Sequence, residues 1–177
     1  MELQSLNVGC GSDLWGDVRV DCCTSFITMR FRPTVFADAE HLPFKGGSFK
    51  VVKASHVLEH LRNPAKALDE ILRVATKELI LSFPTEWDVL PLFLAPDLLS
   101  WKWAYTTRKN KLHLWVIRPE AVTRYLQKNG WESNYKKTYS YSVFHFLEGG
   151  RKAKYFRWLT NNSRIPFEYF VTATRRA

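Results

Sequence analysis

Cysteine is scarce in this sequence, and long apolar runs are absent. Only three of the 177 residues are cysteines, two of them adjacent, which favours free thiols in a reducing compartment over a disulfide framework. No stretch approaches the roughly 20 consecutive apolar residues that a membrane span needs. The first residues also lack the basic and then apolar pattern of a signal peptide. We therefore expect a cytoplasmic protein with no membrane span.

Linkers and repeats are missing as well. The sequence has no low-complexity tract and no stretch rich in proline, glycine or serine that would separate two domains. With 46% hydrophobic residues, a chain of 177 residues is long enough to bury a core of its own. We therefore expect one domain over residues 1–177.

Negative charge is sparse in the second half of the chain. Residues 1–90 carry 10 basic and 12 acidic side chains, whereas residues 91–177 carry 16 basic and five acidic ones. The second half also holds all seven tyrosines and five of the seven tryptophans. Because basic side chains neutralise phosphates and aromatic rings stack on unpaired bases, one hypothesis is that this half binds RNA. The alternative is a basic surface over aromatic residues that form the core around the last strands.

Short apolar segments alternate with turns in the first half. Strands are expected at residues 3–8, 18–21, 34–37, 49–54 and 78–83. Before the last of them, Asn63 is a typical N-cap, and Pro64 fits the first turn of a helix. Its expected buried positions are Leu68, Ile71, Leu72 and Ala75. The expected surface ion pairs, at a spacing of four, are Lys66 with Glu70 and Asp69 with Arg73.

Strand, helix and strand in this order predict a parallel sheet with right-handed crossovers, which is a doubly wound α/β fold. Ligands of such sheets bind at the carboxyl ends of the strands. The first two strands end here at a glycine turn, Gly9-Cys10-Gly11, and at Asp21.

This glycine turn departs from the pattern of a dinucleotide site. Such a site needs G-x-G-x-x-G at the start of a full helix, followed by an acidic residue about 20 positions later. Leu14 stands where the third glycine would be, and the segment between Gly11 and Asp21 is too short for a helix with its turns. The close backbone approach is kept, but the phosphate cradle is weakened. The spacing therefore favours a nucleoside ligand without a pyrophosphate and argues against a nicotinamide-dependent oxidoreductase.

Four motifs follow one another in the first half: Leu6-Asn7-Val8-Gly9-Cys10-Gly11, Val20-Asp21, Asp38-Ala39-Glu40-His41-Leu42-Pro43-Phe44 and Ser55-His56-Val57-Leu58-Glu59-His60-Leu61. In their order and spacing, the sequence resembles class I methyltransferases that use S-adenosylmethionine. The segment from His113 to Trp131 is similar to a later part of that family. The resemblance implies a Rossmann-like, mostly parallel seven-stranded sheet that ends in an antiparallel hairpin, here residues 131–141 and 167–174. The helix after the first strand would be reduced.

The resemblance also implies which residues would hold the adenosine part of the cofactor. Asp21, with Cys22 beside it, would accept hydrogen bonds from both ribose hydroxyls. Asp38 and Ala39 would face the adenine amino group, and Leu42 would pack on the adenine ring together with the proline that follows it. The alternatives are that Asp21 is a solvated loop carboxylate and that Asp38 caps a short turn.

At the other end of the cofactor, the same resemblance places Gly9, Cys10 and Gly11 against the methionine part and Ser55 and His56 near the sulfonium. Residues 87–112 would form a lid that binds the methyl acceptor, or simply a flap that covers the core. Methyl transfer needs mainly that acceptor and methyl be held in line. Where a base assists, the candidates are His60 and His113, for which a structural role is the alternative.

A metal site is a further hypothesis. His56, Glu59 and His60 would share one helical face at positions i, i+3 and i+4, and His113 would complete a set of four ligands. This set is similar to the metal ligands of methyltransferases that modify the terminal ribose of small RNAs, although His56 replaces a glutamate and favours zinc over magnesium. We expect no metal, with Glu59 bonded to nearby backbone and His60 lining the pocket. A methyltransferase is thus the leading reading, and a basic nucleic-acid-binding protein on the same fold is the alternative.

Overall fold

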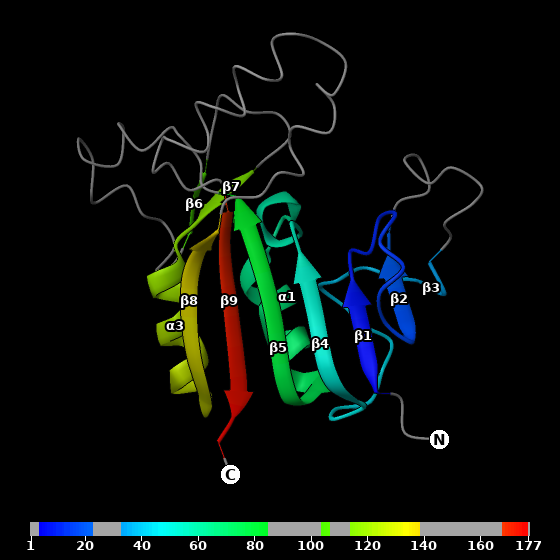
Figure 1. Ribbon diagram of the computed structural model, residues 1–177. Coiled ribbons are helices and arrows are strands. Elements are labelled where there is room, and N and C mark those ends of the chain that lie inside the picture. The colour runs from blue at the N-terminus through cyan, green and yellow to red at the C-terminus, as the bar shows by residue number, and fades with distance from the viewer. Residues whose placement is uncertain (1–3, 23–32, 85–103, 107–113, 139–167, 177) are drawn as a thin grey trace, which may run out of the picture.

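The computed structural model describes residues 4–22, 33–84, 104–106, 114–138 and 168–176. In this part of the chain, seven strands form one sheet in the order β3-β2-β1-β4-β5-β9-β8 (Figure 1). Their bounds are β1 (Ser5–Val8), β2 (Val18–Asp21), β3 (Val35–Phe36), β4 (Phe49–Ser55), β5 (Ala75–Pro84), β8 (Trp131–Thr138) and β9 (Glu168–Arg175).

Strands β1 to β5 are parallel, and the last two strands of the sheet run against them. β9 pairs with β5 and with β8, antiparallel on both sides. The Rossmann-like, mostly parallel seven-stranded sheet with a terminal antiparallel pair is therefore confirmed. A second, two-stranded antiparallel sheet of β6 (Ala104–Thr106) and β7 (Trp115–Ile117) was not foreseen from the sequence.

The helices follow from local sequence. The side chain of Asn63 accepts a hydrogen bond from the Lys66 N–H at 3.1 Å, so α1 (Pro64–Val74) begins as predicted. Its buried residues are Pro64, Ala67, Leu68, Ile71 and Val74, whereas Ala75 already belongs to β5. A second helix, α3 (Pro119–Lys128), also has proline in its first turn.

The ion pairs expected on α1 are wrong. Glu70 pairs with Arg73, three residues on, at 2.7 Å. The physical reason is a competing partner, because the other Glu70 oxygen accepts the backbone N–H of Leu42 from a neighbouring loop. Lys66 contacts His41 instead, and Asp69 accepts a hydrogen bond from the hydroxyl of Tyr125 on α3.

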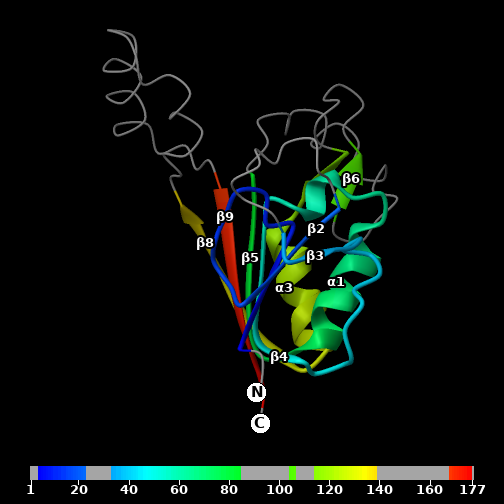
Figure 2. The same cartoon turned by 90° about the vertical axis from the view of Figure 1, so that its right-hand side faces the viewer.

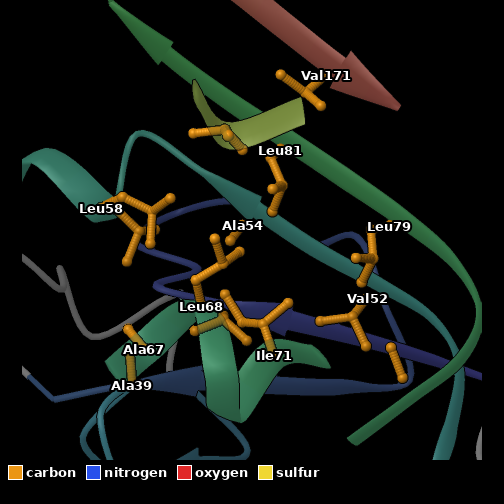
Figure 3. Close-up of a cluster of buried hydrophobic side chains, with 14 of the residues drawn as sticks. Ala39, Val52, Ala54, Leu58, Ala67, Leu68, Ile71, Leu79, Leu81 and Val171 are labelled. Carbon is orange, nitrogen blue, oxygen red and sulfur yellow. The ribbon is translucent and has the colours of Figure 1, made fainter. Parts of the chain in front are cut away.

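Both α1 and α3 cover the same face of the sheet (Figure 2). The core lies between these helices and the sheet, where residues of α1 meet alternate residues of the central strands (Figure 3). Leu68 and Ile71 of α1 and Val52, Leu79 and Val171 of three neighbouring strands are all fully buried. This layer anchors the strand ends that form the candidate site.

The opposite face of the sheet is polar. One row across six strands consists of Arg19, Asn7, Lys53, Ile80, Thr172 and Asn134. Right-handed crossovers from β1 through β2 to β3 would place their helices on this side, opposite α1. The described β1–β2 connection contains no helix, in agreement with the reduced helix that the sequence predicted. In the described part of the chain, helices therefore cover only one face, and none of them is long and apolar enough to cross a membrane.

Candidate functional site at the carboxyl ends of the strands

The turn after β1 requires glycine at two positions. Gly9 and Gly11 both have positive φ angles, of 64° and 50°, which L side chains rarely adopt. A Cβ atom at Gly9 would lie 2.4 Å from Val57 Cγ2, whereas one at Gly11 would meet nothing within 4 Å. The turn is thus packed tightly on one side, and it leaves open space above Gly11.

Asp21 ends β2 beside this open turn. Its Oδ2 accepts a hydrogen bond from the Gly11 N–H at 2.8 Å, and the Cys10 N–H donates to the Val20 carbonyl at 3.0 Å. Cys10 is buried, whereas Cys22 is exposed next to Asp21. The structure therefore brings the predicted turn and the predicted carboxylate together at one edge of the sheet.

The loop between β1 and β2 folds back over the polar face. Asp13 Oδ2 accepts hydrogen bonds from Asn7 Nδ2 at 3.2 Å and from Lys53 Nζ at 2.6 Å. Burial by itself would raise the pKa of the Asp13 carboxyl, but these bonds and one from the Trp15 N–H lower it overall. The carboxylate fastens the loop in place of the helix that is missing here.

The loop after β3 contains the residues expected at adenine. The Asp38 carboxylate accepts the Glu40 N–H at 2.9 Å within a short turn, and its expected role at adenine stays a prediction. Ala39 and Leu42 are both buried in the core. The Ala37 N–H donates to the Asp21 carbonyl at 3.2 Å, which connects this loop to the end of β2.

Ser55 ends β4, and His56 follows it. The Ser55 and Ser82 hydroxyls lie 2.7 Å apart, and the His56 N–H donates to the Ser82 carbonyl at 2.9 Å. His56 has a φ of 55°, a left-handed conformation that is uncommon outside glycine. Sequence reasoning missed Ser82, because nothing local in a buried strand marks one serine as the partner of another.

The His56 imidazole lies between two carboxylates. Its Nε2 is 3.1 Å from Glu168 Oε1, at the start of β9, and its Nδ1 is 3.4 Å from Glu59 Oε1. These contacts, first with Glu168 and then with Glu59, outweigh burial and raise the pKa of His56 to about 9. The ring is therefore an imidazolium at neutral pH. Glu168 was also missed, since it is 112 residues away from His56 in the sequence.

Glu59 is the most deeply buried charge of the site. Its side chain is 1% exposed, and neither carboxylate oxygen has a hydrogen-bond partner among the described residues, in contrast to the expected bonds to nearby backbone. His56, 3.4 Å away, is its nearest counter-charge. The Glu59 carbonyl accepts the N–H of Leu114, next to β7. His60 Nε2 lies 4.0 Å from Glu59 Oε1.

The metal hypothesis expected His56, Glu59 and His60 to share one helical face, and this face does not form. Only residues 58–60 form a 3₁₀ turn, η1 (Leu58–His60), and His56 lies outside it in a left-handed conformation. No cluster of three potential ligands with metal-binding geometry occurs among the described residues. His113 lies outside them, as does the predicted lid at 87–112 except for β6.

Basic and aromatic residues of the last strands contact each other. Lys136 lies over Phe170, Lys137 over Tyr169 and Arg175 over Trp131, at 5.3 to 5.9 Å from the ring centroids. Trp131 is buried in the core. These rings pack within the last strands of the sheet, which supports the alternative that they have a structural role. The basic run at residues 151–154 lies outside the described residues, and RNA binding by the second half of the chain stays a prediction.

A model of a known protein family matches part of the chain. Residues 17–83 match the family model of a methyltransferase domain. This stretch contains Asp21, Asp38, Leu42, Ser55 and His56, but it begins after the glycine turn.

Curated methyltransferases are similar to part of the chain in sequence. The chain is 37% identical over 73 residues to the ubiquinone/menaquinone biosynthesis C-methyltransferase UbiE of Ralstonia pickettii. The aligned segment covers 40% of this chain and 29% of that protein. The chain thus spans under a third of the length of the curated relatives that it matches.

Solved methyltransferase structures superpose on nearly the whole chain. An S-adenosylmethionine-dependent methyltransferase of Thermotoga maritima superposes with a TM-score of 0.61 at 14% identity, over 99% of this chain and 84% of that one. Magnesium protoporphyrin IX methyltransferase of Synechocystis, solved with bound S-adenosylhomocysteine, gives a TM-score of 0.56 at 15% identity, over 98% of this chain and 74% of that one. At such identities the likeness establishes the fold.

Proposed function

We propose that this chain is an S-adenosylmethionine-dependent methyltransferase whose cofactor lies across the carboxyl ends of β1 and β2. The methyltransferase-domain match over residues 17–83 and the fold both support this activity. The methyl acceptor is open between a small metabolite, a glycan or lipid head group, and RNA.

The observation that carries the proposal is the 2.8 Å hydrogen bond from the Gly11 N–H to Asp21 Oδ2. It sets a half-exposed carboxylate beside a glycine turn that has open space above it, at the edge where parallel sheets bind ligands. A carboxylate accepts hydrogen bonds from two neighbouring hydroxyls, as on a ribose.

The same residues disfavour a dinucleotide. A pyrophosphate is held by the N-terminus of a helix after the glycine turn, and the described β1–β2 connection has no helix. That connection contains Asp13 instead, whose carboxylate is bonded to Lys53 and Asn7. A nucleoside with an amino acid attached fits this donor set better.

On the acceptor side, we propose that Ser55 and His56 border the methyl group. S-adenosylmethionine supplies a methyl group on a sulfonium, and the residues of the chain align the acceptor with it. His56 is already protonated and cannot accept a proton at neutral pH. We therefore keep His60 and His113 as the candidate bases for an acceptor that must lose a proton.

Calorimetry with purified protein tests the proposal. We expect binding of S-adenosylmethionine and S-adenosylhomocysteine and none of nicotinamide dinucleotides. Asp21→Ala should weaken binding by about 1.5–3 kcal/mol, the range for a hydrogen bond to a charged group. Asp21→Asn is the matched control, because its amide oxygen still accepts the Gly11 N–H while the charge is lost, and it should bind with intermediate affinity. No binding by the intact chain, or equal affinities for wild type and Asp21→Ala, contradicts the proposal.

A further inference from the structure

The loop from Asp38 to Phe44, here called the Asp38 loop, is strapped to α1 by two side chains. Glu70 Oε2 accepts the Leu42 N–H at 2.8 Å. Arg73 Nη2 donates to the Leu42 carbonyl at 3.0 Å, and Arg73 Nη1 donates to the Phe44 carbonyl at 2.7 Å. The two side chains thus satisfy three backbone groups of one loop.

The strap is rigid because its two side chains also hold each other. Arg73 Nε donates to Glu70 Oε1 at 2.7 Å, and Arg73 Nη2 donates to Glu70 Oε2 at 2.8 Å. Such a bidentate pair fixes the plane of the guanidinium. The contact with Arg73, and after it the Leu42 N–H, lower the pKa of Glu70 despite its partial burial. Both groups are therefore charged around neutral pH.

The residue just before the Asp38 loop contacts the candidate cofactor site. The Ala37 N–H donates to the Asp21 carbonyl, directly behind the carboxylate that faces Gly11. Beyond the loop, the Gly47 N–H donates to the Arg73 carbonyl at 2.8 Å. The path of the chain from β3 to β4 is thus set by Asp21 at its start and by Arg73 in its middle and at its end.

We infer that Glu70 and Arg73 are positioning residues for the adenosine end of the cofactor, although neither belongs to the buried face of α1. This inference rests on the proposed function. Two of the three loop groups that they hold are the N–H and carbonyl of Leu42, the residue expected at adenine. Releasing them changes where the loop lies, while the core residues of α1 stay in place. This role needs no contact between either side chain and the cofactor.

Affinities for two ligands test this role. The apparent affinity scales with the fraction of molecules whose loop is in the competent arrangement, so Arg73→Ala should weaken S-adenosylhomocysteine binding by about fivefold or more. The loss should be equal for 5′-methylthioadenosine, which lacks the amino-acid part, because only the adenosine end is affected. Arg73→Lys keeps the charge but cannot bridge all the partners, so it should fall between Arg73→Ala and wild type.

Arg124→Ala is the matched control. It removes an arginine of α3 whose Nε donates to the Glu120 carbonyl within its own helix, and it should bind both ligands as wild type does. Circular dichroism and urea unfolding check that the variants fold. Should Arg73→Ala fail to fold, Arg73→Lys and Glu70→Gln carry the test.

Hydrogen exchange separates the strap from the cofactor. In the ligand-free protein, Arg73→Ala should speed exchange of the Leu42 amide whether or not a cofactor binds. If wild type binds S-adenosylhomocysteine and Arg73→Ala binds it equally well, or loses affinity only for the ligand with the amino-acid part, the positioning role is wrong. If wild type binds neither ligand while Leu42 exchange still responds, the proposed function fails and the strap is a structural contact alone.

Discussion

His56 Nε2 and Glu168 Oε1 lie 3.1 Å apart, which joins the loop after β4 to the first residue of β9. With Glu59 Oε1 at 3.4 Å from the other ring nitrogen, the imidazolium has one carboxylate on each side. One buried and one partly exposed carboxylate are therefore brought to the candidate acceptor side by a single cation.

The titration of His56 follows from this arrangement. Its pKa is raised from 6.5 to about 9, so the stabilisation from its charge is complete below about pH 6.5 and is lost as pH rises through about 9. Glu168→Gln should lower the pKa of His56, measured by NMR of its ring protons, and flatten the alkaline decline in stability. The resonance is assigned with His56→Asn, which tolerates the left-handed backbone. A wild-type pKa near 6.5 would refute the ion pairs.

The two glycines of the first turn should respond differently to alanine. Gly9→Ala combines a left-handed residue with a Cβ only 2.4 Å from Val57, so it should destabilise the fold by roughly 3 kcal/mol or more. Gly11→Ala has no clash and should cost about 1–2 kcal/mol from its φ angle alone. Urea unfolding measures both. Because its methyl fills the open space, Gly11→Ala should still lose S-adenosylhomocysteine affinity, and unchanged affinity would move the cofactor away from this turn.

The Asp13–Lys53 pair should govern part of the acid response. The pKa of Asp13 is lowered in the folded protein, so its stabilising effect is present above the unfolded value of about 3.9 and is lost as pH falls through the folded value. Asp13→Asn should therefore lose less stability than wild type between about pH 5 and pH 3 in urea titrations. In a Lys53→Met background, Asp13→Asn should change the acid-induced loss of stability less, because the main partner of the carboxylate is gone. Parallel curves for wild type and Asp13→Asn would contradict this assignment.

The N-cap of α1 offers a test of local structure. Asn63→Ala removes the acceptor for the Lys66 N–H and should cost about 1 kcal/mol of folding free energy. Asn63→Ser retains a capping oxygen and should stay within a few tenths of a kcal/mol of wild type. A loss in Asn63→Ser equal to that in Asn63→Ala would contradict the capping role, because both variants keep the backbone N–H that donates to Glu40.

Features that depend on neighbouring residues could be read from the sequence. β2 has the predicted bounds, Val18–Asp21, because a short alternation of apolar residues between turns has only one way to pair. The cap at Asn63 was predicted for the same reason, since capping chemistry lies within four residues. The sequence pattern also predicted that the glycine turn and Asp21 end the first two strands, and the structure brings them together.

Contacts across the fold could not be read in this way. Glu70 has Lys66 and Arg73 within reach on its own helix, and the choice between them is made by Leu42, which approaches only after folding. The same holds for Glu168, which meets His56 because β9 pairs with β5. Both side chains hold positions that sequence periodicity would assign to an ordinary surface.

The place of β9 in the sheet has a consequence for the order of folding. β9 comes last of the described strands in the chain, yet it lies between β5 and β8, and β8 has no other partner in the described sheet. During synthesis, β5 and β8 must both wait with unpaired edges until β9 emerges, and such edges template wrong pairings. Since β5 with β9 and β9 with β8 are far apart in sequence, closing them is also the slow step expected from contact order. The same strand supplies Glu168, so the charge that holds His56 arrives only when the sheet is complete.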